Sequence, residues 1–244
     1  MGEALIFQKY NGSSEELFAT ISVTYPSGST CTCTKGSRTL TDTNTNGTAV
    51  FAIPESGTWT VSCTDGNNTA SKSVSVTTKG GNSSVALVYP LILWDMSAGG
   101  DNSSITGGWV SNAVRYESIY GIDVAISPTA TKNSNGSITV RDPNTSGSTG
   151  KSGLWRTAKQ INFTNYSKLM FTGTTSYEFW NRAAIFSSPT EWVKDRTVAT
   201  TALSSTSYNK VNLINLSSVN GNYYFGFFVG GLKQITVQKI WLEP

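Results

Sequence analysis

The sequence has no histidine, and this absence removes several chemistries at once. Histidine is the most frequent general base in enzymes and the most frequent metal ligand, so a Ser-His-Asp triad, a Cys-His pair and a zinc-histidine site are all excluded. Catalysis would have to rely on carboxylates, and only 14% of the residues carry a charge. The carboxylates that could serve are Asp95, Asp101, Asp123, Asp142, Glu178, Glu191 and Asp195. They form no recognisable pair or motif, so we expect a protein that is not an enzyme and has no cofactor.

Long apolar runs and clusters of basic residues are also missing. No segment reaches the roughly 18 consecutive apolar residues of a membrane span. Residues 1–16 lack the apolar stretch and the basic leader of a secretory signal. The net charge is only +3, and the basic residues form no arm or stripe of the kind that binds nucleic acid. We expect no membrane insertion, no nucleic-acid partner and no export by a signal of the chain's own.

Strong helix formers are scarce, whereas Thr, Val, Ile and aromatic residues, which favour strands, are plentiful. Between residues 17 and 90 the pattern is that of short strands closed by turns. Ala19, Ile21, Val23 and Tyr25 alternate with polar residues, and Asn-Gly and Asp-Gly pairs follow at 46–47 and 65–66. About seven such strands predict an immunoglobulin-like β-sandwich, with Trp59 in its core.

The three cysteines, Cys31, Cys33 and Cys63, lie among strand residues. Cys31 and Cys33 point to the same face of one strand, about 7 Å apart, which is too far for easy bridging. The pattern favours buried free thiols. One bridge from either residue to Cys63 stays open as an alternative, and the odd count leaves at least one thiol free or intermolecular.

Three segments of this region, YPSGSTCTCTKG, IPESGTWTVSCTDG and KSVSV, carry a family resemblance. The region resembles an Ig-like module of tail-associated and other virion proteins of phages and prophages of gut Firmicutes. The resemblance implies a spacer or docking domain without catalytic residues. It also implies assembly in the bacterial cytoplasm, followed by a place in the virion.

Residues 91–244 differ in composition, since six of the seven tryptophans lie there. Strands are expected at 138–140, 160–163, 169–171, 179–186, 211–216, 223–229 and 235–242, which favours a jelly-roll-like sandwich. The segments QINFTNYSKLMF, NYYFGFFVGG and ITVQKIWLE resemble the late strands of carbohydrate-binding-module-like jelly rolls. We therefore predict an all-β protein of two β-sandwich domains: Ig-like at 17–90 and jelly-roll-like at 91–244, with residues 1–16 as an N-terminal arm or docking strand.

A saccharide site needs exposed rings beside hydrogen-bonding groups, because sugars present both apolar faces and hydroxyls. The residues in or near predicted strands that meet this requirement are Tyr177, Trp180, Arg182, Trp192 and Tyr224. Core packing is the alternative for each ring, since tryptophans are usually buried. Asp101-Asn102-Ser103 has the oxygen atoms for a calcium ion, but a polar loop is the favoured interpretation, and we predict no metal site.

The sequence thus predicts a non-enzymatic virion component, associated with a phage tail or baseplate, that contributes to host attachment by binding cell-surface glycan. Its partners would be other virion proteins, in an oligomer or in multiple copies. One alternative is a purely structural capsid-decorating or tail-spacer protein. Another is a bacterial surface or secreted protein that binds host glycoprotein or immunoglobulin. Fold alone does not choose among them.

Overall fold

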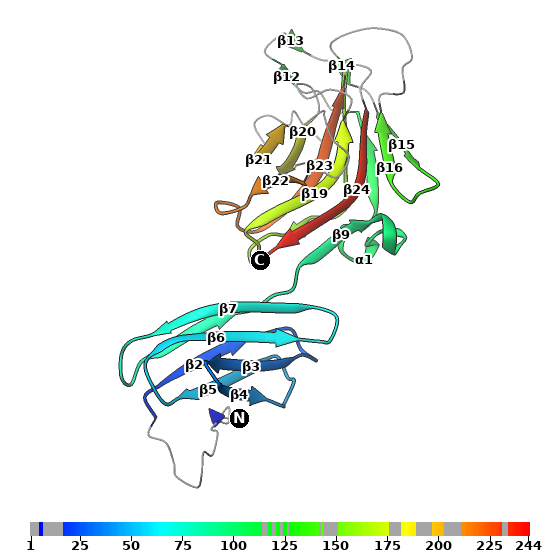
Figure 1. Ribbon diagram of the computed structural model, residues 1–244. Coiled ribbons are helices and arrows are strands. Elements are labelled where there is room, and N and C mark those ends of the chain that lie inside the picture. The colour runs from blue at the N-terminus through cyan, green and yellow to red at the C-terminus, as the bar shows by residue number, and fades with distance from the viewer. Residues whose placement is uncertain are drawn as a thin grey trace. The chain divides into compact units, whose positions relative to one another are not determined.

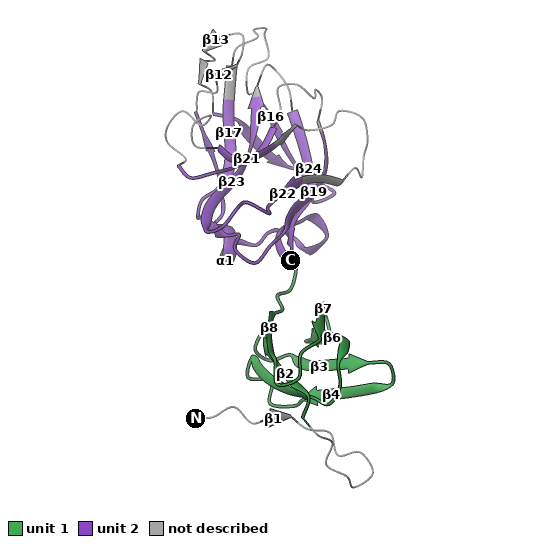
Figure 2. Cartoon of the chain, turned by 90° about the vertical axis from the view of Figure 1, so that its left-hand side faces the viewer, with its two compact units in different colours: residues 1–90, 244 green, residues 91–243 purple. Residues whose placement is uncertain are grey.

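The computed structural model describes residues 5–6, 17–113, 117–118, 121–122, 124–125, 127–141, 143, 151–175, 182–188, 197–202, 211–230 and 234–244. The chain forms two compact units, Met1–Pro90 together with Pro244, and Leu91–Glu243 (Figure 2). Within the described ranges the regular structure is almost entirely strand, so the predicted all-β class with two β-sandwiches is confirmed.

Unit 1 contains two four-stranded sheets, β1-β5-β2-β8 and β4-β3-β6-β7 (Figure 1). Its strands are β1 (Leu5–Ile6), β2 (Ala19–Thr24), β3 (Thr30–Lys35), β4 (Arg38–Asp42), β5 (Thr48–Ile53), β6 (Gly57–Thr64), β7 (Thr69–Val76) and β8 (Asn82–Ala86). Within residues 1–16, β1 is the part that the structure describes, and it pairs with β5 in parallel. The rest of the predicted arm lies outside the described residues.

The alternation in unit 1 has the expected consequence for burial. Ile21 and Val23 are buried, and the intervening Ser22 is half-buried. Trp59 is fully buried, at 0% exposure, and its indole Nε1 donates a hydrogen bond to the carbonyl oxygen of Glu55 at 3.2 Å. The prediction that this ring belongs to the core is confirmed.

All three cysteines are buried free thiols, as the pattern favoured. Cys31 of β3 lies directly opposite Cys63 of β6 in the antiparallel pair, while Cys33 lies opposite Val61. Burial raises the pKa of both the Cys31 and the Cys33 thiols to about 12. These thiols therefore behave as small apolar groups of the core.

Unit 2 contains two larger sheets, which we name after their central strands. In the β24 sheet, β24 (Gln234–Glu243) pairs with β19 (Lys168–Thr175) along most of its length (Figure 1). Its other edge pairs with β16 (Ile138–Arg141) and then with β9 (Leu91–Asp95). This sheet is completed by β10 (Gly100–Asp101), β15 (Thr129–Lys132) and β22 (Val211–Asn215).

In the β23 sheet, β23 (Asn222–Gly230) lies between β17 (Lys151–Thr157) and β20 (Arg182–Phe186). Beyond them lie β11 (Trp109–Asn112), β14 (Val124–Ala125) and β21 (Thr197–Ala202), while β18 (Ile161–Asn162) extends the β17 side. A small separate pair is formed by β12 (Glu117–Ser118) and β13 (Gly121–Ile122). Of these strands, β18, β20 and β23 overlap predicted strands, whereas none was predicted at β11, β12, β13, β14, β17 or β21.

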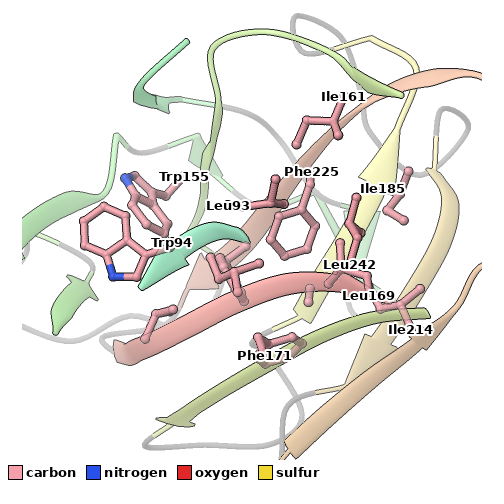
Figure 3. Close-up of a cluster of buried hydrophobic side chains, with 14 of the residues drawn as sticks. Leu93, Trp94, Trp155, Ile161, Leu169, Phe171, Ile185, Ile214, Phe225 and Leu242 are labelled. Atoms are coloured by element: carbon pink, nitrogen blue, oxygen red, sulfur yellow. The ribbon is translucent and has the colours of Figure 1, made fainter. Parts of the chain in front are cut away.

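The core of unit 2 lies between these two sheets (Figure 3). Leu169, Phe171 and Leu242 come from the β24 sheet, and Trp155 and Phe225 come from the β23 sheet. Such facing apolar layers define a β-sandwich.

Helical structure in the described ranges is limited to a 3-10 turn (Met96–Ala98) and the short helix α1 (Ser103–Thr106). In the part of the chain that the structure describes, no helix is long and apolar enough to cross a membrane.

Replacing Trp59 by alanine should lower the free energy of unfolding by about 3 to 5 kcal/mol, because it leaves a cavity where a fully buried ring was. Chemical denaturation measures this loss. Thr60→Ala is the control, since Thr60 is the half-buried neighbour on the opposite face of β6 and should cost less than about 1 kcal/mol. Equal costs for the two variants would contradict the core position of Trp59.

The buried thiols also predict a dependence of stability on pH. The Cys33 pKa is about 12 in the folded chain, against 9.0 for an ordinary thiol, so above pH 9 the unfolded chain releases a proton that the folded chain retains. The free energy of unfolding should therefore fall as the pH rises from about 9 toward 12. Urea denaturation at several pH values measures the slope, which should be shallower for Cys33→Ala. An unchanged slope would contradict this contribution.

Candidate functional site

The β23 sheet has apolar side chains on both of its faces. Along β23, Phe225, Phe227 and Val229 point into the sandwich core. Tyr224, Gly226 and Phe228 alternate with them and therefore occupy the opposite side, which we call the outer face. Residues opposite one another in the strand pairs share a face, and this adds Leu154 and Arg156 of β17, Arg182, Ala184 and Phe186 of β20, and Val110 and Asn112 of β11.

The floor of the outer face is a second, smaller apolar cluster. Leu154, Ala184, Phe186 and Phe228 are buried there, and the half-buried Tyr224 packs against them. The rings of Phe186 and Tyr224 are stacked, with centroids 6.0 Å apart and planes inclined by 20°. The Phe186 ring thus packs against one face of the Tyr224 ring.

Arg156 lies on this aromatic floor. Its guanidinium carbon is 5.0 Å from the centroid of the Tyr224 ring, and its Nη1 donates a hydrogen bond to the carbonyl oxygen of Thr157 at 2.8 Å. Arg156 is only 9% exposed, and this burial lowers the pKa of its guanidinium group. A guanidinium still keeps its proton at neutral pH, so this face holds a charge that is largely withdrawn from water.

Gly226 makes room for Arg156 in the neighbouring strand. The two residues are direct partners in the β17–β23 pair. A Cβ atom at position 226 would lie 2.7 Å from the carbonyl oxygen of Trp155 and 2.8 Å from Cβ of Arg156. These distances are shorter than van der Waals contact, so any larger residue would displace the strand that carries Arg156.

The outer face also contains buried side-chain polar atoms that have no hydrogen-bond partner. In the part of the chain that the structure describes, three buried side-chain polar atoms have no hydrogen-bond partner: Trp94 Nε1, Asn112 Oδ1 and Arg156 Nε. Two of the three, one acceptor and one donor, belong to residues of the outer face. Buried polar atoms are almost always paired, so each of these atoms calls for a partner such as a water molecule, an ion or a ligand group.

Two of the five residues predicted for a saccharide site lie on the outer face. Tyr224 pairs with Phe186 and Arg182 pairs with Phe228, both across the β20–β23 ladder, and each is half-buried. Tyr177, Trp180 and Trp192 lie outside the described residues.

Arg156 and Asn112 were not among the predicted site residues, because the sequence pattern predicts no strand at 151–157 or 109–112. One signal for β17 was present in the chain: Leu154 and Trp155 are adjacent, as expected of a strand that is buried on both faces. The sheet therefore brings together two residues that were predicted and two that were not.

Asp101, whose carboxylate oxygens could bind calcium, instead accepts hydrogen bonds from side chains of the fold. Its Oδ1 accepts hydrogen bonds from Thr106 Oγ1 at 2.6 Å and from Trp109 Nε1 at 2.8 Å. Trp109 in turn stacks on Trp155 at 4.1 Å between centroids. Among the described residues, no three Asp, Glu, Cys or His side chains gather as metal ligands would.

No protein-family model matches this chain, and no curated protein matches it. Several solved structures match the chain at low identity and low TM-score. One is a mutant of a carbohydrate binding module of family 29, at 10% identity and a TM-score of 0.38, with 63% of this chain and 89% of that chain covered.

A second is a glycoside hydrolase family 43 arabinoxylan arabinofuranohydrolase from Bacillus subtilis, in complex with cellotetraose. It is 9% identical, with a TM-score of 0.34, and the match covers 81% of this chain and 56% of that chain. A third comes from work on carbohydrate-binding modules of the β-sandwich superfamily, at 15% identity and a TM-score of 0.29, with 88% and 85% covered. Identities and TM-scores this low give no basis for transferring a binding residue or an activity to this chain.

Proposed function

We propose that the chain is a non-enzymatic glycan-binding protein and that the outer face of its β23 sheet is the binding surface. The observation that carries the proposal is the coincidence of two partnerless polar atoms, Asn112 Oδ1 and Arg156 Nε, on a face that also presents the Tyr224 ring. A saccharide offers what these groups lack, because its hydroxyls donate and accept hydrogen bonds while its C–H face packs on an aromatic ring.

The arrangement suits binding better than catalysis. The described residues of this face include an amide, two guanidinium groups and an aromatic ring, but no carboxylate. Hydrolysis of a glycosidic bond ordinarily needs a pair of carboxyl groups, one on each side of the bond. The described residues of the outer face thus include groups that could hold a sugar in place and no carboxylate that could cleave it.

Replacement of Tyr224 by alanine should weaken saccharide binding by about tenfold or more, because it removes both the stacking surface and the partner of Arg156. A glycan array probed with the full chain identifies a ligand, and titration calorimetry then compares the variants. The matched control is Tyr223→Ala on the same strand, because Tyr223 packs against the sandwich core and not on the outer face. Both variants need a thermal melt that shows an intact fold.

Trp180 and Trp192, which lie outside the described residues, stay predicted saccharide-binding residues. Their double replacement by alanine should reduce cell adsorption of a multimerised protein, since a single site of millimolar affinity contributes only about −4 kcal/mol and attachment requires many copies. Unchanged adsorption by a variant that is still folded would show that these two rings do not take part in binding. If no saccharide bound the unmodified chain at all, the proposal itself would be wrong.

We propose further that the chain acts in a phage or prophage particle, associated with the tail or baseplate, where glycan binding contributes to host attachment. The support is the resemblance of residues 17–90 to Ig-like virion modules, followed in the chain by a second sandwich. Many copies of the chain on one particle would compensate for weak single sites.

Mass spectrometry of purified particles from the producing strain tests this location. The chain should be present at multiple copies per particle, and antibodies against it should reduce adsorption to host cells. Its absence from purified particles would contradict the virion assignment and would leave glycan binding by the second unit untouched.

A further inference from the structure

The charges of the β23 sheet are of one sign only. Its seven strands, β11, β14, β17, β18, β20, β21 and β23, contain the basic residues Lys151, Arg156 and Arg182 and no acidic residue. Two of these bases, Arg156 and Arg182, lie on the outer face. The sheet therefore offers a ligand positive charge without competing carboxylates of its own strands.

Arg156 also lacks an anionic partner among the described residues. The ion pairs found there join Lys35 to Glu55, Lys168 to Glu243 and Lys239 to Asp95. Removing a charge from water is costly unless a counter-charge and hydrogen bonds replace the solvent. The Tyr224 ring and one backbone carbonyl provide part of this compensation, and the partnerless Nε shows that the compensation is incomplete.

We infer that the outer face selects anionic saccharides, in which a carboxylate or phosphate oxygen pairs with the Arg156 guanidinium while the sugar ring packs beside Tyr224. This inference rests on the proposed glycan-binding function and names its ligand class. A guanidinium matches both groups, because its planar fork donates parallel hydrogen bonds to two oxygens of a carboxylate or a phosphate. Arg182, half-buried on the same face, adds a second positive charge.

Two pairs of polysaccharides test the inference with the full chain, one pair for each source of charge. Sodium polygalacturonate is compared with its methyl ester, and phosphomannan is compared with neutral mannan. Affinity electrophoresis or calorimetry should show at least about tenfold tighter binding to the charged member of one pair, as expected for a charge-assisted hydrogen bond. The pair that shows the preference identifies carboxylate or phosphate as the recognised group.

The variants Arg156→Gln and Arg182→Gln distinguish specific binding of the anionic group at these two arginines from unspecific electrostatic attraction. Arg156→Gln should abolish the preference for the charged polymer, and Arg182→Gln should reduce it. Lys168→Gln is the matched control: it removes the same charge from β19 of the other sheet, where the Lys168 side chain is 51% exposed, and should leave the preference unchanged. If Arg156→Gln fails to fold, the Arg182→Gln variant and the two polymer pairs still test the inference.

Equal binding to the charged and neutral members of both pairs, or binding to none of the four, would overturn the inference. An equal loss of affinity in Arg156→Gln and Lys168→Gln would also overturn it, because it would indicate unspecific attraction. The proposed function is judged separately by the glycan array: a chain that binds only neutral saccharides there keeps the proposed function and loses this inference.

Discussion

Burial on both faces of β23 is the constraint on which unit 2 depends. Phe225 and Phe227 fill the sandwich core on one side, while Phe228 belongs to the smaller cluster on the other side. A strand with buried side chains on both faces has little freedom in its pairing register. A shift of one residue would move the side chains of each face to the opposite face. The same constraint fixes the register that places Arg156 opposite Gly226 and beside the Tyr224 ring.

The alternating segments of the chain were the ones that sequence reasoning predicted well. Ile21 and Val23 of β2 are buried on one face only, so their period of two is visible in the sequence. Strand β17 has no such period, because Leu154 and Trp155 are buried in different clusters on opposite faces. Alternation alone predicts strands whose apolar residues lie on one face, and it overlooks strands that carry apolar residues on both faces.

The candidate site was predictable only in part, for the same reason. Tyr224 and Arg182 were identified by residue type within or beside predicted strands, and the structure places both on the outer face. Arg156 and Asn112 were missed because their importance depends on what they lack, namely a hydrogen-bond partner. Partnership is a property of the folded chain: it depends on strands that come from distant parts of the sequence, and no local pattern encodes it.

The position of β24 has a consequence for synthesis on the ribosome. This strand is hydrogen-bonded to β9, β16 and β19, so Leu91–Asp95 pairs with residues 144 to 151 positions later in the chain. The β24 sheet cannot close until translation has delivered residues 234–243. The strands β2 to β8 find their partners within residues 19–86, so unit 1 can complete its sheets while unit 2 is still being made. During synthesis, unit 1 can therefore fold before unit 2, whose sheets depend on contacts between residues far apart in the sequence.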